Sequence, residues 1–516
     1  MRWSLSAFAV LSPLVAGASA QQPSTFIMLM NNDTLAVERV TRTAGQLDGE
    51  LVSQNLGVRV RYAATLAADG TMPRVETWSY RAADTNGVHV VMQQHGDTMI
   101  VELPGRTMRL PSRTGALVYF NPSMGLLEQA LLRGRTLGIS SPVEVPLFQS
   151  AGGAVVPLSV TWVGSDSAHV ALSGVAMNAS LGVDGRLTGL SIPAQNVRVV
   201  RVEGSRTMTL AKPDYSAPND APYTAEEVTV RTPAGIKLTG TLTLPKQRPA
   251  RGAPAVVTIT GSGTEERDES IPGVNGYRPF RQIADTLGRR GIAVLRLDDR
   301  GAGGSDAGPA GPTSADFADD VRAALAYLRT HGDIDGTRLG LVGHSEGGLI
   351  APMVAANEPK LRAIVLMAGP AQTGRTILKY QQEYAADSML HLTGTRRDSA
   401  LRDMATKLDS SAKAVPWLHF FLDYDPIATA KRVKQPVLIL QGATDRQVTP
   451  DQAPALAAAF RSAGNADVTM RVFPSTDHLF LADPAGNPSG YGRLPSKNVR
   501  ADVLGALADW LAARLR

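Results

Sequence analysis

The first half of the chain is dominated by short segments in which apolar and polar residues alternate. Alternation with a period of two is typical of β-strands that bury one face. Turn-forming pairs such as Asp69-Gly70 and Asn86-Gly87 separate the segments. The pattern is clearest at residues 57–66, 88–94, 98–103, 155–163, 168–172 and 196–202. Apart from one helical stretch at 124–135, it predicts an all-β, antiparallel domain over residues 21–211, built as a sandwich or an open barrel.

The pattern changes after a proline-rich linker that we expect at residues 212–223. A β-hairpin at 227–232 and 238–244 opens the second region, which we expect to span residues 224–516. Apolar runs then alternate with segments of helical period. Strands are expected at 255–260, 293–298, 339–342, 363–368, 437–441 and 468–473, and helices at 280–290, 314–330, 347–358, 452–463 and 500–515. Such alternation predicts a mostly parallel sheet with helices on both faces.

A mainly helical insertion at about residues 374–433 breaks this alternation. It follows the sixth strand, so it lies next to the carboxyl ends of the strands, where a lid would cover a site. Its aromatic side chains could either line a substrate pocket or pack the lid onto the core. These side chains are Trp417, Phe420, Phe421 and Tyr424.

The composition changes this picture little. The 516 residues are 43% hydrophobic and carry a formal net charge of +5. The basic residues are scattered rather than gathered in tracts, so we expect no nucleic-acid partner. The chain has no cysteine and therefore no disulfide. The histidines of the first region are dispersed, and we expect neither a metal nor a cofactor.

The first twenty residues have the pattern of a secretory signal peptide. Arg2 is followed by an apolar run over residues 5–15, and Ala18-Ser19-Ala20 fits a cleavage site after Ala20. The apolar run is too short for a stable membrane span. We therefore expect an exported protein, periplasmic or extracellular.

One short motif points to chemistry. Gly343-His344-Ser345-Glu346-Gly347 stands between an apolar strand and a helix. A serine on such a sharp strand-to-helix turn exposes its hydroxyl, and the flanking glycines avoid collision with the neighbouring strand and helix. Ser345 is therefore the candidate nucleophile, and His344 is expected to point away from it.

A serine hydroxyl needs a general base, and the base needs an orienting carboxylate. The order nucleophile, acid, histidine is expected for this architecture. Asp445 follows the strand at 437–441, and His478 follows the strand at 468–473. Asp445 could instead be only a turn-forming aspartate. Asp477 is the weaker candidate, because its side chain should diverge from that of its neighbour His478.

The oxyanion of a tetrahedral intermediate needs hydrogen-bond donors. One candidate is the backbone N–H of Glu346, at the start of the helix after the nucleophile. The other lies in the loop after the strand at 255–260, where we favour the N–H of Ser262, with Gly263 as the alternative. The glycine-rich segment 297–305 lacks the ending of a phosphate loop and is expected to be a buried polar turn that braces the site.

Several segments together carry a family resemblance: TGSGTEERDE, RGIAVLRLDDRGAGGSD, FADDVRAALAYLR, GLVGHSEGG, WLHFFLDYDP, PVLILQGATDRQV, and DHLF followed by PSGYG. From about Glu227 to the C-terminus the chain resembles bacterial α/β-hydrolase carboxylesterases with an N-terminal β extension, a group related to prolyl-oligopeptidase-like hydrolases. The resemblance implies an α/β-hydrolase fold and hydrolysis of carboxylic esters, with short acyl chains. By motif position, it assigns Ser345, Asp445 and His478 to the family's triad, but it gives no role to the β region.

The sequence therefore predicts a serine carboxylesterase that acts on small esters through an acyl-enzyme. A peptidase or aminopeptidase, or an acyltransferase, would use the same scaffold and stays an alternative. About 190 residues of β structure without a blade repeat cannot build a seven-bladed propeller. The β region could instead bind an envelope component or a polymer.

Overall fold

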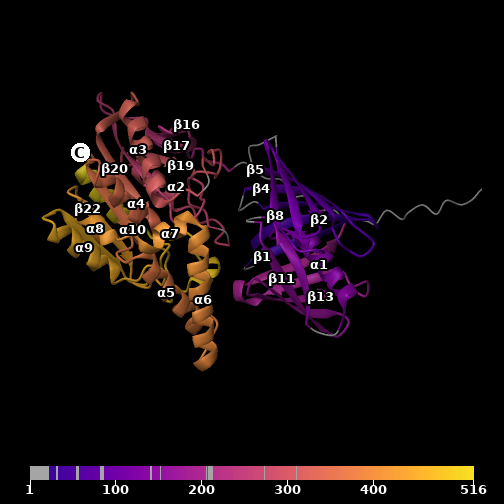
Figure 1. Cartoon of the computed structure of the whole chain (residues 1–516). Coiled ribbons are helices and arrows are strands. Elements are labelled where there is room, and N and C mark those ends of the chain that lie inside the picture. The colour runs from indigo at the N-terminus through magenta and orange to yellow at the C-terminus, as the bar shows by residue number, and fades with distance from the viewer. Residues whose placement is uncertain are drawn as a thin grey trace, which may run out of the picture.

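The computed structural model describes residues 23–30, 33–53, 57–81, 87–139, 142–150, 153–204, 206, 213–271, 273–309 and 311–515. The expected signal peptide lies outside these ranges, as does Lys212 at the start of the expected linker. The described strands form two sheets, which occupy separate parts of the molecule (Figure 1). The expected fold class, an all-β region followed by an α/β hydrolase, is confirmed.

The N-terminal sheet contains the first fifteen strands of the described chain. They are β1 (Ser24–Met30), β2 (Asp33–Arg42), β3 (Gln46–Ser53), β4 (Val58–Thr65), β5 (Arg74–Arg81), β6 (Val88–His95), β7 (Thr98–Leu103), β8 (Arg106–Pro111), β9 (Leu117–Tyr119), β10 (Val143–Gln149), β11 (Val155–Val163), β12 (Ser167–Leu172), β13 (Val175–Leu181), β14 (Leu187–Ile192) and β15 (Val197–Glu203). Their order is β8-β7-β6-β5-β4-β3-β2-β1-β15-β14-β13-β12-β11-β10-β9. This is one continuous open sheet with edges β8 and β9, so the expected alternative of a two-sheet sandwich is wrong.

One pair of neighbours in this sheet is parallel, which corrects the expectation of a purely antiparallel domain. β9 and β10 run parallel, and the helix α1 (Met124–Leu137) connects them. Parallel neighbours need a crossover connection, and a helix commonly supplies it. The helix is capped by Ser123, whose side chain accepts from Leu126 N, and its apolar side chains belong to the core of this sheet. The helical stretch in the β pattern therefore has a topological cause.

The C-terminal sheet has eight strands in the order β16-β17-β19-β18-β20-β21-β22-β23. They are β16 (Tyr223–Arg231), β17 (Lys237–Pro245), β18 (Ala253–Ile259), β19 (Ala293–Leu297), β20 (Ile334–His344), β21 (Ala363–Met367), β22 (Val437–Gly442) and β23 (Val468–Phe473). The hairpin β16–β17 is antiparallel, and the pairs from β19 to β23 are parallel. Every residue of β18, β21 and β22 is buried, as expected for strands covered on both faces.

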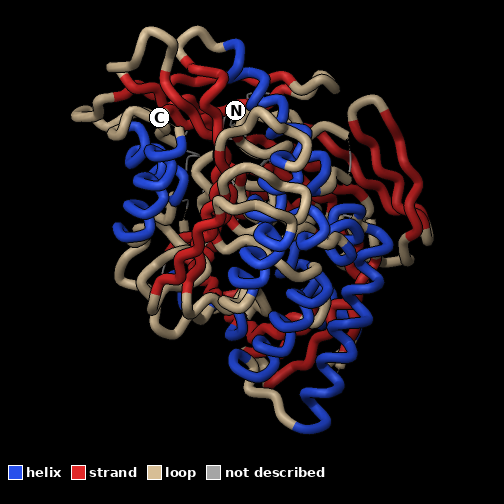
Figure 2. The backbone as a smooth tube through the Cα atoms, turned by 90° about the vertical axis from the view of Figure 1, so that its left-hand side faces the viewer, coloured by secondary structure: helices blue, strands red, loops and turns tan. Residues whose placement is uncertain are grey.

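Helices cover this sheet, as Figure 2 shows from the side where they lie in front of the strands. The helices between and after the strands are α2 (Pro279–Gly288), α3 (Ser314–Thr330), α4 (Glu346–Ala355), α9 (Gln452–Ser462) and α10 (Ala501–Arg514). The helix α3 begins with a capping box between Thr313 and Asp316. Two separate apolar clusters, which contain α3 and α10 respectively, pack against the sheet.

Between β21 and β22 the chain forms the expected helical insertion. It consists of α5 (Gly374–Tyr384), a π-helical turn (Ala385–Met389), α6 (Gly394–Ala414), α7 (Pro416–Asp423) and α8 (Pro426–Ala430). Proline occupies the first turn of α7 and of α8, where its missing N–H costs no intrahelical bond.

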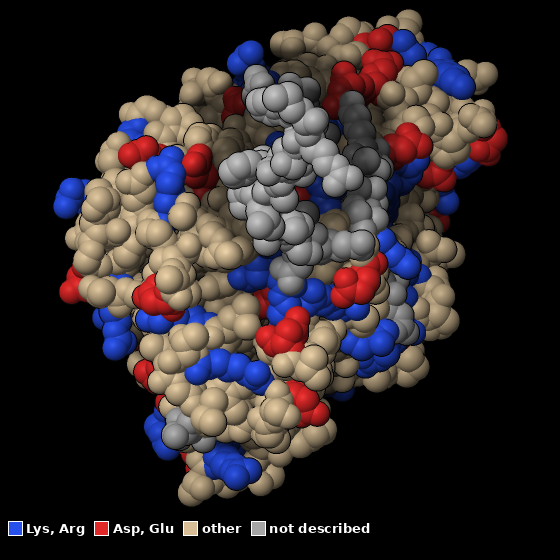
Figure 3. All heavy atoms as spheres, turned by 90° about the vertical axis from the view of Figure 1, so that its right-hand side faces the viewer, with Lys and Arg blue, Asp and Glu red and all other residues tan. Residues whose placement is uncertain are grey.

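Charged residues of both signs are interspersed on the face shown in Figure 3. In the described ranges, no helix combines the length and apolar character needed to cross a membrane.

Candidate active site

Ser345 stands on a sharp turn between β20 and α4. Its backbone has φ +52° and ψ −115°, a strained conformation for a residue with a side chain. The flanking glycines are required by space: a Cβ on Gly343 would lie 2.0 Å from the oxygen of Gly347, and a Cβ on Gly347 would lie 2.1 Å from the oxygen of Ile259. The steric prediction for the motif is therefore confirmed.

Asp445 and His478 lie together in the loops that follow β22 and β23. The Nδ1 atom of His478 is 2.8 Å from Oδ2 of Asp445, which also accepts from Gln441 Nε2 at 3.0 Å. The other oxygen of Asp445 accepts from the backbone N–H groups of Gln447 and Val448. Asp445 therefore both forms its own turn and contacts the histidine, so it is more than a turn-forming aspartate.

A cavity of about 420 Å³ joins the loops that carry these residues. Ser345 and His478 both line it, together with Ser262 and Glu346. Because Nδ1 of His478 faces Asp445, its Nε2 is the nitrogen left for a proton from the serine. No hydrogen bond joins Ser345 Oγ to His478 among the described residues, and such contacts commonly tighten only when substrate is bound.

Ser262 and Glu346, which carry the candidate oxyanion donors, line the same cavity. The N–H groups of Ser262 and Glu346 donate to no other group in the described chain, and Glu346 begins α4, where the helix dipole favours negative charge. The N–H of Gly261, by contrast, is occupied, because it donates to Glu269 at 2.8 Å.

His344 and Glu269 form a second buried pair that the sequence did not reveal. The Nδ1 atom of His344 is 2.8 Å from Oε1 of Glu269, and its Nε2 is 2.9 Å from the carbonyl oxygen of His478. A carbonyl only accepts, so Nε2 of His344 carries a proton. Burial lowers the pKa of His344, but the Glu269 carboxylate outweighs it and the net direction is upward. His344 does point away from Ser345, yet it ties three loops of the site together.

Two of the four expected aromatic side chains, both on α7, line the cavity. Trp417 and Phe421 line it, stack on one another with ring centroids 5.2 Å apart, and sit one turn apart on the same face of the helix. Phe420 and Tyr424 instead stack on each other and do not line the cavity, which corrects the expectation for these two.

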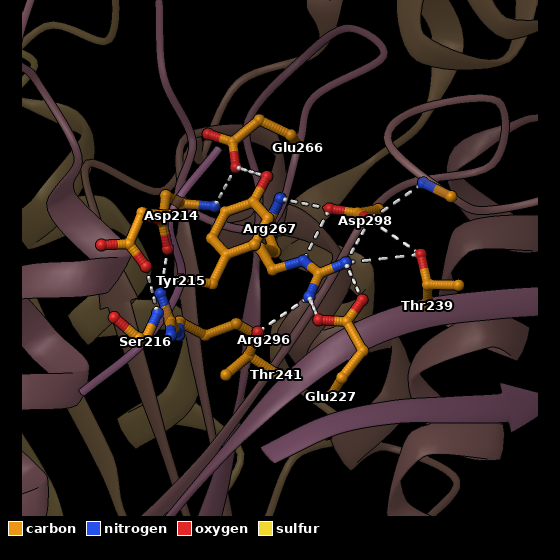
Figure 4. A network of polar contacts seen from close by, with 12 residues as sticks. Asp214, Tyr215, Ser216, Glu227, Thr239, Thr241, Glu266, Arg267, Arg296 and Asp298 are labelled. Carbon is orange, nitrogen blue, oxygen red and sulfur yellow. Dashed lines mark hydrogen bonds and ion pairs between the residues drawn. The ribbon is translucent and has the colours of Figure 1, made fainter. Parts of the chain in front are cut away.

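The turn at residues 297–305 braces the loop that carries Ser262, as expected. Arg267 lies at the centre of this polar network (Figure 4): its guanidinium binds Asp298 at 2.7 Å and Glu227 at 2.9 Å. It also lies over the ring of Tyr215, whose hydroxyl donates to Glu266 at 2.9 Å. The network thereby connects the segment before β16 to the loop after β18.

Carboxyl groups are unusually crowded beside the cavity. Burial, Glu269 and Asp299 raise the pKa of Glu265 well above its usual range, and burial raises the pKa of Glu346. Burial also raises the pKa of Asp299 to about 8 and that of Asp477 to about 7. Asp477 diverges from His478 and accepts from Leu481 N, so its expected exclusion from the triad agrees with its placement.

The raised pKa of Asp299 predicts a pH-dependent stability. Between its unfolded pKa of about 4 and its folded pKa of about 8, the folded state holds a proton that the unfolded state has released. Raising the pH through this window therefore lowers the free energy of unfolding, by at most about 1.4 kcal/mol per pH unit. Asp299→Asn removes this dependence, so its stability relative to wild type should rise between about pH 5 and about pH 8.

Urea unfolding of wild type and Asp299→Asn at both pH values measures this difference. The exposed Asp509, changed to Asn in the same way, controls for loss of a surface carboxylate. If the free energy of unfolding changed equally with pH in wild type and in Asp299→Asn, the prediction would be contradicted.

No group of three or more His, Asp or Glu side chains in the described ranges is arranged to hold a metal ion.

Comparison with known proteins adds family information. Residues 279–494 match the model of the prolyl oligopeptidase family. The chain is 28% identical to esterase EstD of Thermotoga maritima over an alignment of 309 residues, and this alignment covers 58% of the chain and 69% of EstD. It is 28% identical over 189 residues to the α/β hydrolase domain-containing protein WAV2 of Arabidopsis thaliana, covering 36% of this chain and 54% of WAV2. Among solved structures, the chain is similar to the esterase Pf2001 of Pyrococcus furiosus. The alignment covers 59% of this chain and 98% of the Pf2001 chain, with 17% sequence identity and a TM-score of 0.40.

Proposed function

Since the chain belongs to the α/β-hydrolase carboxylesterases with a prolyl-oligopeptidase-like domain, we propose that it hydrolyses carboxylic esters through an acyl-enzyme on Ser345. The observation that carries the proposal is the shared cavity. It brings the strained Ser345 to the same space as His478, which is held by Asp445 at 2.8 Å. Ester hydrolysis by the similar EstD, as its name states, supports the reaction class.

Acylation would begin with attack of Ser345 Oγ on the ester carbonyl. His478 Nε2 accepts the serine proton, and Asp445 keeps the other nitrogen protonated and stabilises the imidazolium. The carbonyl oxygen becomes an oxyanion, which the N–H groups of Ser262 and Glu346 would bind; both residues line the cavity, and neither N–H donates to another group in the described chain. Each such donor contributes about 3–4 kcal/mol of transition-state stabilisation in other enzymes. The intermediate then breaks its bond to the alkoxy oxygen, and His478 gives that oxygen its proton.

Deacylation would repeat these steps with water. His478 takes a proton from the water as it attacks the acyl carbon, and the bond to Ser345 Oγ breaks as the proton returns to the serine. The acid leaves and the enzyme is restored. A cavity of about 420 Å³ with Trp417 and Phe421 in its wall favours small substrates, so we infer a preference for short acyl chains.

The relation to prolyl oligopeptidases makes a peptidase the second candidate. The described β region is one continuous sheet rather than a set of separate propeller blades, which favours the esterase. Assay of purified protein on p-nitrophenyl acetate and on aminoacyl-naphthylamides, side by side, tests the choice. We expect kcat/KM for the ester to exceed that for the amide. Amide turnover without ester turnover would replace the esterase by a peptidase, and acyl transfer would appear as a new ester when an alcohol is added.

Two further inferences concern the rest of the chain. We infer export from the signal pattern of residues 1–20. Binding of an envelope component or a polymer by the β region stays a prediction, which retention of the full-length protein on such a polymer would test.

A further inference from the structure

Three carboxylates line the cavity, and no Lys or Arg side chain of the described chain accompanies them. Glu265, Glu269 and Glu346 all line it, whereas none of its described lining residues is Lys or Arg. The two histidines that line the cavity each contact a carboxylate already: His478 contacts Asp445, and His344 contacts Glu269. The cavity therefore carries an excess of acidic groups.

The acidic groups next to the nucleophile lack partners of opposite charge. Neither Glu265 nor Glu346 forms an ion pair with another described residue. The Oε2 atoms of Glu265 and Glu269 are buried and have no hydrogen-bond partner in the described chain, and the Glu269 residue is only 1% exposed. Unpartnered buried carboxylate oxygens are costly, and native proteins keep them mainly where they have a function.

Glu265 also lies close to the reacting atoms. The position that a Cβ on Gly261 would occupy is 3.5 Å from Ser345 Cβ and 3.9 Å from Glu265 Oε2. A carboxylate at this place can reach a group one or two bonds from a carbonyl that is bound at Ser345. Trp417, Phe421 and Tyr491 also line the cavity, and aromatic faces attract cations.

We propose that this cavity selects esters that carry an alkylammonium group close to the scissile carbonyl, with Glu265 as the main residue that recognises the cation. This rests on the proposed ester hydrolysis and specifies its substrate class. An organic cation fits better than a metal ion, because the described side chains offer no cluster of three ligands.

The electrostatics agree with this assignment. The neighbouring carboxylates and burial that raise the pKa of Glu265 are the conditions that a bound ammonium relieves. An ammonium also donates up to three hydrogen bonds, so it satisfies the free oxygens of Glu265 and Glu269. A neutral substrate leaves both oxygens without partners.

Two pairs of nearly isosteric esters test the proposal. The p-nitrophenyl esters of glycine and of propionic acid differ by NH₃⁺ against CH₃ on the acyl side. The acetate esters of 2-aminoethanol and of 1-propanol differ in the same way on the alcohol side. Each kcat/KM is divided by the rate constant of the same ester with hydroxide, at a pH where the amine is protonated, to remove differences in intrinsic reactivity.

We expect the ammonium ester to be preferred by about tenfold or more in one of the two pairs, and the responding pair tells which side of the ester carries the cation. Glu265→Gln should lower that preference by about tenfold or more, whereas Glu358→Gln should not change it. Glu358 pairs with Arg329 and does not line the cavity. A preference for the neutral ester in both pairs, or an equal preference in wild type and Glu265→Gln, would overturn the proposal.

Thermal unfolding separates this inference from the proposed function and checks the fold of the variant. We expect n-propylammonium to raise the unfolding midpoint of wild type more than that of Glu265→Gln, and propionate not to raise it. If no ester is hydrolysed, the proposed function is wrong. The shift of the unfolding midpoint by n-propylammonium then still tests whether the cavity binds an organic cation. Equal midpoints with and without n-propylammonium in wild type would refute the site.

Discussion

Ser345→Ala is expected to reduce ester turnover by about 10⁴- to 10⁶-fold. The variant lacks the oxygen that forms the acyl-enzyme, so residual turnover would come only from binding and the oxyanion donors. The fold should survive, because the Ser345 side chain has no recorded hydrogen bond in the described chain, while its backbone N–H still donates to Met367 at 2.8 Å. We therefore expect the free energy of unfolding to change by less than about 0.5 kcal/mol.

Turnover of p-nitrophenyl acetate and urea unfolding measure these two effects. Ser462→Ala is a matched control, since Ser462 lies at the end of α9 and its hydroxyl donates to Ala459. Mass spectrometry after treatment with an organophosphate should locate the adduct on Ser345 in wild type. Retained activity in Ser345→Ala, or an adduct at another serine, would show that the nucleophile lies elsewhere.

Asp445→Asn is expected to lower kcat/KM by about 10⁴-fold. If the asparagine oxygen keeps the two bonds from Gln447 N and Val448 N, its NH₂ group faces His478 Nδ1. A donor there favours the tautomer with the proton on Nε2, which cannot accept a proton from Ser345. The asparagine also lacks the charge that stabilises the imidazolium.

Asp477→Asn is the matched control, because Asp477 is the sequence neighbour of His478 and is also buried. Its Oδ1 accepts from Leu481 N, and its pKa of about 7 means that a neutral side chain is tolerated there near neutral pH. We expect Asp477→Asn to lower kcat/KM by less than about tenfold. An Asp477→Asn variant as inactive as Asp445→Asn would transfer the orienting role to Asp477.

Much of the fold was determined by the local pattern. Mainly apolar runs became the fully buried strands β18, β21 and β22, and amphipathic segments became α2 and α3, because burial on two faces or on one face imposes a pattern that a short window reveals. The elbow at Ser345 was also visible in the sequence, since glycines within two residues mark it, although the contact that requires glycine at 347 is with Ile259 of β18. Ser345, Asp445 and His478 could be expected to lie near one another because each follows a parallel strand, and the carboxyl ends of these strands share one edge of the sheet.

The tertiary structure alone decided the remaining features, because they depend on which loops meet. Glu269 and His344 are 75 residues apart, and they come together because β18 and β20 are neighbours in the sheet although β19 lies between them in the sequence. For the same reason no pattern pointed to Glu265 as a wall of the cavity. The choice of Trp417 and Phe421 over Phe420 and Tyr424 depends on how α7 is rotated against the sheet, and the role of α1 on which strands it connects. Local periodicity determines that a segment buries a face, but the partner of that face is chosen only by the packing of the whole chain.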